Sequence, residues 1–480
     1  MAHARFMAPL VLAAGWCAAG AGAQVVVPVE QQAAAPDVAP SLSPGIELSG
    51  QLRTTWLDKR AARQGPVAQA NAWLPGVAAA EPSAVTWQVE WRAATRTRTG
   101  AGGLGLHASG TVQHRHTQGG GSHSTGWLDE AVVSGSFAAF VARSPGDGEA
   151  SGPDAGGGQA SGWAAWQWSV GKKVVSWDVG YAFRPNDVVQ QEVRRGLVPS
   201  ALTGRPLLMA EHFDADTAWS LVWVNPTQGK ALDDMGRSSD EAALAVRVYH
   251  RAGAADWHGF ARWGRRTGGS VGAAVSWVAS DALELHASVR HFAHADAMYA
   301  ADTSSASPAG TALLARNPWQ PVLTGSGQQM LVGGTWTGER QISLLAEAWY
   351  DGAALSKTQW AQWAARTQRL PGWADAGAPA GPVAGNLAWQ ASAFSAAATG
   401  SLHRQNVYAR LSWTHEGWQP ALDVLFHPAD RGRIVTASLT WQGDRVKVEG
   451  GLRVNAGPAT AVVRQLPVGR QAYLSGTWAF

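Results

Sequence analysis

Residues 433–441, RIVTASLTW, indicate the fold most clearly, because apolar and polar side chains alternate strictly from Val435 to Trp441. The polar parity carries Thr436, Ser438 and Thr440, and the apolar parity carries Val435, Ala437, Leu439 and Trp441. Successive side chains of a strand point to opposite faces of its sheet. The stretch therefore predicts a β-strand with one apolar and one polar face.

The same alternation recurs along the chain. It is present in residues 86–98, 243–249, 282–290, 406–413, 445–454 and 472–480. Runs of about ten residues match the length that a tilted strand needs to cross a bilayer. The repeated pattern predicts an all-β protein, a transmembrane antiparallel up-and-down β-barrel.

Composition supports an all-β membrane protein. Charged residues make up only 15% of the chain, with 26 Trp, 56 Gly and a mean hydropathy of -0.13. Soluble domains carry about 25% charged residues, and helical bundles favour strong helix formers over Gly and Trp. The net charge of +3 comes without a long Lys/Arg block, so we expect no nucleic-acid partner.

The first 23 residues have the features of a secretory signal peptide. Arg5 is followed by an apolar run over residues 7–16 and by the small residues 21–23 that precede cleavage before Gln24. Residues 24–43 are rich in Pro, Ala and Gln and predict a flexible periplasmic lead-in. The barrel is expected over residues 44–480. The only cysteine, Cys17, lies in the predicted signal peptide.

The connections between predicted strands alternate in length. Longer connections fall near residues 296–325 and 352–403, and tight turns fall near Gly443, Gly417, Gly338, Ser280 and Gly253. Short periplasmic turns and longer external loops are typical of up-and-down barrels. The alternation is consistent over about twelve strands from about residue 215 onward, but residues 161–213 accommodate two, three or four strands. We therefore expect about 16 strands, with 14 and 18 as open alternatives.

Tryptophans stand near the ends of the apolar faces, as in Trp87, Trp263, Trp413, Trp441 and Trp478. An interfacial aromatic girdle requires this placement. A secreted β-sandwich or propeller, the soluble alternative, would also have alternating strands but has no need of such a girdle.

Two stretches resemble known outer-membrane proteins. A last strand that ends in Phe480, with Trp478 two positions earlier, resembles the terminal signature of Gram-negative outer-membrane β-barrel proteins. This resemblance implies insertion by the barrel assembly machinery and contact with outer-membrane lipid and lipopolysaccharide. Residues 171–195 are similar to a pattern of porin-like and polysaccharide-export-like outer-membrane proteins, with Asp178 where Gly is common; the matching residues are Gly171, Lys172, Trp177, Gly180, Pro185 and Asp187.

Charges gather in the second half of this pattern and just after it, and they supply the candidate site. Pro185 breaks a strand ladder, and lipid would not tolerate the charged residues around it, which are Arg184, Asp187, Glu192, Arg194, Arg195 and Arg205. One interpretation is a segment folded into the lumen as a constriction with opposed charges. The other is an external loop whose charges meet solvent.

No other motif predicts chemistry. His114 and His116 share a strand face, but no third ligand is placed beside them. Ser412 and His415 have opposite parity, and the chain has no nucleophile elbow or phosphate loop. We therefore expect no enzyme, no metal and no cofactor.

The polar strand faces predict a modestly positive lumen. Ten basic residues face five acidic ones: Arg92, Arg96, Arg98, Arg247, Arg262, Arg290, Arg410, Arg445, Lys447 and Arg453, against Glu90, Glu284, Glu347, Asp423 and Glu449. We expect an outer-membrane channel that lets small polar or anionic solutes pass, or exports polysaccharide, with a mild anion preference. The alternatives are an outer-membrane enzyme acting on lipid and a closed structural barrel with binding loops.

Overall fold

The computed structural model describes residues 46–78, 83–96, 103–137, 165–191, 196–198, 202–226, 241–300, 317–394 and 401–480. The predicted signal peptide and lead-in lie outside these residues. None of the helices in the described part of the chain combines the length and the apolar character needed to cross a membrane.

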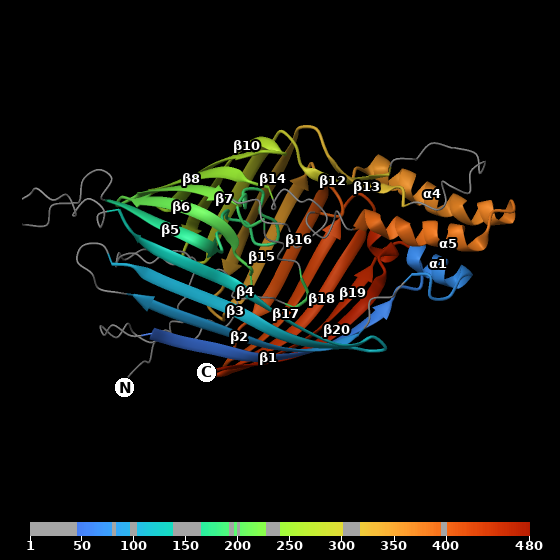
Figure 1. Cartoon of the computed structure of the whole chain (residues 1–480), viewed down its shortest axis with the longest axis horizontal. Coiled ribbons are helices and arrows are strands. Elements are labelled where there is room, and N and C mark those ends of the chain that lie inside the picture. The colour runs from blue at the N-terminus through green and yellow to red at the C-terminus, as the bar shows by residue number, and fades with distance from the viewer. Residues whose placement is uncertain are drawn as a thin grey trace, which may run out of the picture.

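Eighteen strands of the described residues form one antiparallel sheet that closes into a barrel (Figure 1). Each strand pairs with the strands before and after it, and β1 closes the ring by pairing with β20 over residues 51–61 and 468–479. The strands are β1 (Ile46–Ala61), β2 (Ala84–Arg96), β3 (Gly105–Thr117), β4 (Gly121–Ser136), β5 (Trp166–Lys173), β6 (Arg205–Phe213), β7 (Thr217–Val224), β8 (Ala243–Ala252), β9 (Ala255–Gly264), β10 (Gly268–Ser280), β11 (Leu283–Phe292), β14 (Gly327–Thr337), β15 (Ile342–Asp351), β16 (Gln405–Trp413), β17 (Trp418–His427), β18 (Gly432–Gln442), β19 (Val446–Ala456) and β20 (Val468–Ala479).

The predicted fold class is confirmed, and the strand number is the upper of the expected values. The open alternatives fell on residues 161–213, where the described residues contribute two strands, β5 and β6, because residues 174–191 leave the sheet. Twelve barrel strands follow from β7 onward, and β1–β4 precede them. A register shift interrupts the pairing of β3 with β4 between Ser109 and Gly110.

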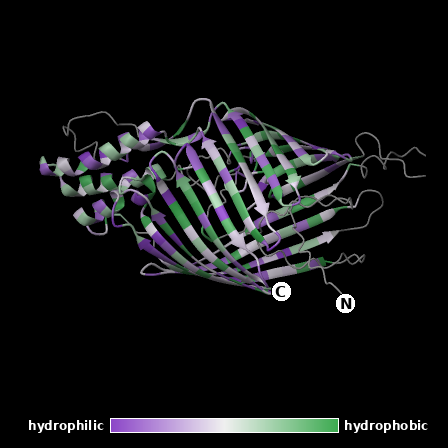
Figure 2. Cartoon of the chain, turned by 180° about the vertical axis from the view of Figure 1, so that it is seen from behind, coloured by the Kyte–Doolittle hydropathy of each residue, from purple (hydrophilic) through white to green (hydrophobic). Residues whose placement is uncertain are grey.

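The alternation of the sequence becomes two barrel faces. On β18, Leu439 is 45% exposed on the outer face, whereas Thr440 is 8% exposed on the lumen face. Figure 2 shows hydrophobic and hydrophilic residues alternating along the strands. Exposed tryptophans stand near both ends of the outer face: Trp56, Trp87, Trp223 and Trp263 toward the helices, and Trp219, Trp257, Trp277, Trp336, Trp413, Trp418 and Trp478 toward the termini. This is the apolar band with aromatic girdles of a transmembrane barrel.

The two ends of the barrel differ as the connection lengths predict. Most of the tight turns lie at the end that holds both termini, and most of the long connections lie at the opposite end, where helices project and which we call the helical end (Figure 1). The exceptions are the tight turns after β3, β9 and β17 at the helical end, and the connection over residues 137–165 at the end with the termini. The long connections at the helical end contain α1 (Pro66–Trp73), the hairpin β12 (Asp296–Ala300) and β13 (Trp319–Leu323), α4 (Lys357–Asp375), α5 (Ala380–Trp389), η4 (Gln390–Phe394) and η5 (Val462–Gln465).

A small hydrophobic core holds the helical end together. Trp360 and Trp363 of α4 are buried beside Trp319 of β13 and Val463 of η5. The helix α4 begins at Ser356, whose Oγ accepts a hydrogen bond from the Gln359 backbone N–H at 3.2 Å, while the Gln359 side chain accepts one from the Ser356 N–H at 2.8 Å. This capping box satisfies two backbone donors that the helix itself cannot pair.

Candidate functional site

The chain between β5 and β6 does not continue the sheet but lies inside the barrel. We call residues 174–191 the lumen segment, because its side chains pack against the inward faces of the strands. At its start, Gly171 has a φ of 131°, and an added Cβ would lie 2.0 Å from the Ala131 carbonyl oxygen. Only glycine fits this position, which redirects the chain from the wall into the lumen.

The two ends of the lumen segment pack on one side of the inner wall. Trp177 and Val189 lie in a buried cluster with Met209 of β6, Val222 of β7 and Phe260 of β9. Trp177 is 4% exposed and its ring centroid is 6.3 Å from that of Phe260. This part of the lumen wall is apolar. The lumen segment covers it and removes its side chains from water, which is favourable for apolar surface.

The middle of the lumen segment reaches the next part of the wall. Phe183 stacks on Trp349 of β15 with ring centroids 5.6 Å apart, and Leu331 of β14 completes this cluster. Tyr181 stacks on Tyr408 of β16 at 6.1 Å. Together the packing contacts extend from β6 to β17, which is more than half of the ring of strands.

A buried carboxylate ties the middle of the segment to the wall. Glu347 of β15, whose side chain is 0% exposed, accepts hydrogen bonds from the backbone N–H groups of Tyr181 at 2.6 Å and Ala182 at 2.7 Å. Its Oε1 also lies 3.0 Å from His286 Nε2 of β11. These partners compensate for burying the charge.

A second polar anchor fastens the segment to β10 and β11. Asn186 donates through Nδ2 to Ser288 Oγ at 2.9 Å and to the Val289 carbonyl at 3.0 Å. It lies so close to Gly272 of β10 that a Cβ added there would be 1.9 Å from Asn186 Oδ1. The missing side chain of Gly272 therefore leaves the space that Asn186 occupies.

Asp178 occupies a backbone conformation that usually requires glycine. Its φ is 88°, a backbone conformation that favours glycine, the residue common at this place in the pattern. The Asp178 carboxylate accepts hydrogen bonds from the backbone N–H groups of Val179 at 2.9 Å and Asn186 at 2.5 Å. These bonds stabilise the turn that glycine would adopt without them.

The structure describes three of the six predicted site residues, Arg184, Asp187 and Arg205. Arg184 donates to the Gly180 carbonyl at 2.7 Å and to Ser176 Oγ at 2.6 Å, so it braces the segment internally. Asp187 is 3% exposed and accepts from the Trp177 N–H at 3.2 Å. Arg205 begins β6 opposite Lys173 of β5. Glu192, Arg194 and Arg195 lie outside the described residues.

The predicted terminal residues lie at the seam of the barrel. The Phe480 N–H donates to the Gly50 carbonyl at 2.9 Å, and the Gly50 N–H donates to the Phe480 carbonyl at 3.0 Å. Trp478 and Phe480 are 48% and 57% exposed on the outer face, and their ring centroids are 5.3 Å apart. The Phe480 ring covers Gly50, where a Cβ would meet it at 2.7 Å.

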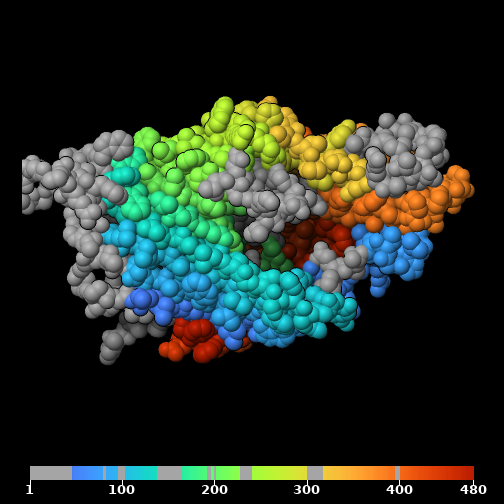
Figure 3. Space-filling view, viewed as in Figure 1, coloured from blue at the N-terminus to red at the C-terminus, as the bar shows by residue number. Residues whose placement is uncertain are grey.

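The packing clusters of the lumen segment do not include β18–β20 or β1–β3 within the described residues, and the lumen face of this wall is polar. Gln51, Arg53 and Thr55 of β1 point inward, and Ser475 and Thr477 of β20 continue the polar surface beside them. Figure 3 shows a hollow near the helical end, through which strands late in the chain are visible.

Four of the five acidic residues predicted to face the lumen form ion pairs: Glu90, Glu347, Asp423 and Glu449. Arg53 lies 3.8 Å from Glu90, and Arg410 donates to Asp423 at 3.1 Å. The Lys447 ammonium is 3.0 Å from Glu449. These pairs engage acidic residues but leave the excess of basic over acidic residues on the lumen face unchanged. Sequence parity identifies the face but not these partners.

The residues that fasten the lumen segment could not be recognised from the sequence. Glu347 was expected only as one lumen charge among many, Asn186 only as a residue that breaks the strand ladder after Pro185, and Gly272 was not singled out. Their roles depend on β10, β11 and β15 lying beside one another in the ring. The described residues contain no group of three or more His, Cys, Asp or Glu placed to hold a metal ion.

The chain is similar to known proteins in structure only. No family model and no curated protein matches the chain. Among solved structures, a triple mutant of the Rhodopseudomonas blastica porin is similar, with a TM-score of 0.41 and 10% identity, covering 91% of this chain and 100% of that chain. Pseudomonas aeruginosa OccK5 (OpdH) is similar with a TM-score of 0.48 and 9% identity, covering 91% of this chain and 98% of that chain.

Proposed function

We propose that this protein is a channel of the Gram-negative outer membrane for passive passage of small polar solutes. The observation that carries the proposal is the one-sided anchoring of the lumen segment, whose packing clusters extend over the wall from β6 to β17 and, within the described residues, do not include the polar wall of β18–β20 and β1–β3. A segment fixed in this way narrows the lumen without closing it, and so limits permeants by size. Small solutes fit this passage better than a polysaccharide chain does.

The location and the assembly route belong to the same proposal. An exported barrel would lose residues 1–23 on cleavage and reach the outer membrane through the barrel assembly machinery, with Trp478 and Phe480 as the recognised residues. It would then lie among outer-membrane lipid and lipopolysaccharide. The outer-face aromatic girdles and the apolar band support a membrane location.

The proposed selectivity is a mild preference for anions. Two acidic residues on the wall of β18–β20 and β1–β3 already have partners. Glu90 accepts a hydrogen bond from Gln51 and Glu449 accepts one from Tyr473, in addition to their ion pairs with Arg53 and Lys447. Arg92 is exposed on the lumen face of β2, and half-buried Arg453 lies on the lumen face of β19. Their field is screened over about 10 Å at 0.1 M salt, so the preference would fade as salt rises.

Planar-bilayer recording on the refolded protein tests the proposal. We expect discrete conductance steps and, under a salt gradient, a reversal potential that favours the anion. The double variant Arg92→Gln, Arg453→Gln should reduce this preference, whereas Arg340→Gln, in the exposed turn between β14 and β15, should leave it unchanged. Cation preference in the unmodified protein would contradict the proposed selectivity. A barrel without conductance would contradict the channel itself and favour a closed structural barrel or an enzyme acting on lipid.

A further inference from the structure

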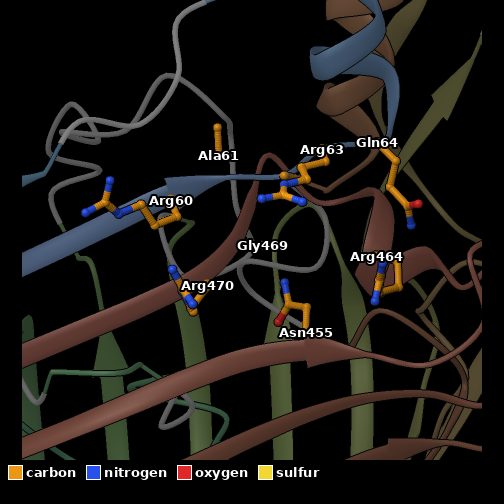
Figure 4. A pocket seen from close by; sticks show the side chains of 9 residues that line it. Arg60, Ala61, Arg63, Gln64, Asn455, Arg464, Gly469 and Arg470 are labelled. Atoms are coloured by element: carbon orange, nitrogen blue, oxygen red, sulfur yellow. The ribbon is translucent and has the colours of Figure 1, made fainter.

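Four arginines meet at the rim of the barrel at its helical end. Arg60 ends β1, Arg63 lies in the turn that follows, Arg464 belongs to η5, and Arg470 lies near the start of β20. They line a hollow of about 510 Å³ together with Gln64 and Asn455 (Figure 4). We call these four residues the arginine cluster.

The backbone around the arginine cluster is held in place. The Ala62 N–H donates to the Pro467 carbonyl at 2.9 Å, and Gln64 Nε2 donates to the Ala459 carbonyl at 3.1 Å. Gly65 has a φ of 99°, and an added Cβ would lie 2.5 Å from the Gln465 carbonyl oxygen. The turn after β1 and the chain before β20 therefore form one close-packed unit, so the site is formed before any ligand arrives.

The arginine cluster carries more positive charge than its neighbours balance. Arg60 and Arg470 are direct partners in the β1–β20 register, and like charges directly opposite each other destabilise a sheet. The acid beside them is Asp58, which accepts from Arg60 Nε at 2.8 Å. Within the described residues, Arg63, Arg464 and Arg470 form no ion pair. A bound anion would relieve this repulsion.

The depth of the cluster in the membrane indicates the source of that anion. Trp56 and Leu474 are register partners on the outer face, 46% and 54% exposed, and belong to the apolar band. Arg60 lies four residues beyond Trp56, which is ~13 Å along the strand and ~9 Å along the membrane normal for a strand tilted by about 45°. Its side chain is 66% exposed. This position, just outside the apolar band, is the level of the lipid headgroups.

We propose that the arginine cluster binds the phosphate of a lipid headgroup, namely the phosphorylated glycolipid of the external leaflet. The inference rests on the outer-membrane location proposed above, since long connections mark the external end of such barrels. Guanidinium groups bind phosphate through two parallel N–H···O bonds, and several of them can share the three free oxygens of a phosphate monoester. Gln64 and Asn455 supply further polar groups at the same hollow.

Native mass spectrometry of the detergent-solubilised barrel tests the proposal, with bisphosphorylated lipid A as the probe. The variant combines Arg63→Gln, Arg464→Gln and Arg470→Gln, and the control is Arg340→Gln at the opposite end of the barrel. We expect the variant to bind lipid A at least about tenfold more weakly than the unmodified protein, and the control to bind it normally. Dephosphorylated lipid A should bind weakly to all three proteins.

Three results would overturn the proposal. Equal lipid A affinity in the variant and the unmodified protein would show that the arginine cluster is not the binding site. Equal binding of lipid A and dephosphorylated lipid A would show that the phosphate is not recognised. Inorganic phosphate is the third arm: if it binds with the same dependence on the arginines and lipid A binds no more tightly, the ligand is free phosphate. Arg464→Lys is a milder variant that keeps the charge but loses the paired donors, and it should also weaken binding.

Conductance of the same proteins separates this inference from the channel proposal. The arginine cluster lies on the outer rim, so the triple variant should conduct like the unmodified barrel. Lipid A binding by a barrel that does not conduct would contradict the channel proposal and support the binding site. Normal conductance without lipid A binding would support the channel and contradict the binding site.

Discussion

The carboxylate of Glu347, in the wall of the barrel, accepts a hydrogen bond from the backbone N–H of Tyr181, in the lumen segment, at 2.6 Å. The Ala182 N–H and His286 Nε2 approach the same carboxylate. A charged acceptor with three partners and no exposure to solvent is a strong tether. The position of the lumen segment, and thus the width of the passage, depends on it.

Glu347→Gln should loosen the lumen segment. The amide keeps one oxygen acceptor and introduces donors toward backbone N–H groups, so we expect a loss of about 2 kcal/mol. Single-channel recording should show larger or noisier conductance, and hydrogen exchange should accelerate in residues 174–191. The control is Glu416→Gln, whose side chain is 84% exposed in a turn at the end with the termini. Unchanged conductance in Glu347→Gln would show that the tether does not set the pore width.

Gly272→Ala should displace the lumen segment by steric contact. The new Cβ would overlap Asn186 Oδ1 at 1.9 Å and approach the Val289 carbonyl oxygen at 2.5 Å. We expect the barrel to fold and the conductance to change. The matched control is Gly259→Ala on neighbouring β9, where an added Cβ meets nothing within 4 Å. Conductance altered equally by the two substitutions would point to a general effect of alanine in these strands.

Leu439→Arg and Ser438→Arg test the two faces of β18. Leu439 is exposed on the outer face, and an arginine there should cost roughly 2–4 kcal/mol if it lies near the bilayer midplane. Ser438 is half-buried on the lumen face, where an arginine can reach water. Unfolding by urea in lipid vesicles measures both. Similar losses from the two variants would contradict the assignment of faces.

Asp430 should make stability depend on pH in acid. Burial alone would raise the pKa of Asp430, but hydrogen bonds from His403 Nε2 at 2.9 Å, the Val462 N–H at 2.7 Å and the Gly432 N–H at 2.8 Å outweigh burial and lower it to about 2. Because the pKa in the folded protein lies below the ordinary 3.8, the stabilisation is present above pH ~4 and is lost as the pH falls toward 2. It amounts to about 2 kcal/mol.

Asp430→Asn removes this carboxylate and serves as the comparison. The difference in melting temperature between the two proteins in detergent should be large at pH 5 and small near pH 2. Other carboxylates titrate in both proteins, so the difference isolates Asp430. A constant difference across this range would contradict the lowered pKa.

Phe480→Ala should separate assembly from stability. The ring covers Gly50 and is otherwise 57% exposed, so its loss should affect the refolded barrel only slightly. If Phe480 is read during assembly, the yield of outer-membrane protein in cells should fall far more than the refolding yield in detergent. Trp223→Ala, an exposed tryptophan at the other end, is the control. Equal losses in cells and in detergent would mean that Phe480 contributes packing alone.

Local alternation in the sequence was enough to assign strand residues to one side of the barrel wall or the other. Leu439 and Thr440 could be assigned to lipid and lumen from their neighbours alone, because the two faces of a strand alternate at every residue and lipid and water select opposite side chains. The twelve strands from β7 onward follow this rule and were predicted. The turns near Gly253 and Gly443 were predicted for the same local reason.

The partners of those faces depend on the tertiary fold. Arg184 and Asp187, expected as constriction charges, lie in the lumen segment, where they hydrogen-bond to Ser176 and to the backbone of Trp177. Glu347 contacts Tyr181, and Arg60 pairs in register with Arg470, although each pair is separated by more than 160 residues of chain. A local pattern reports the environment of one strand, whereas partners such as these are set by the order in which eighteen strands close into a ring.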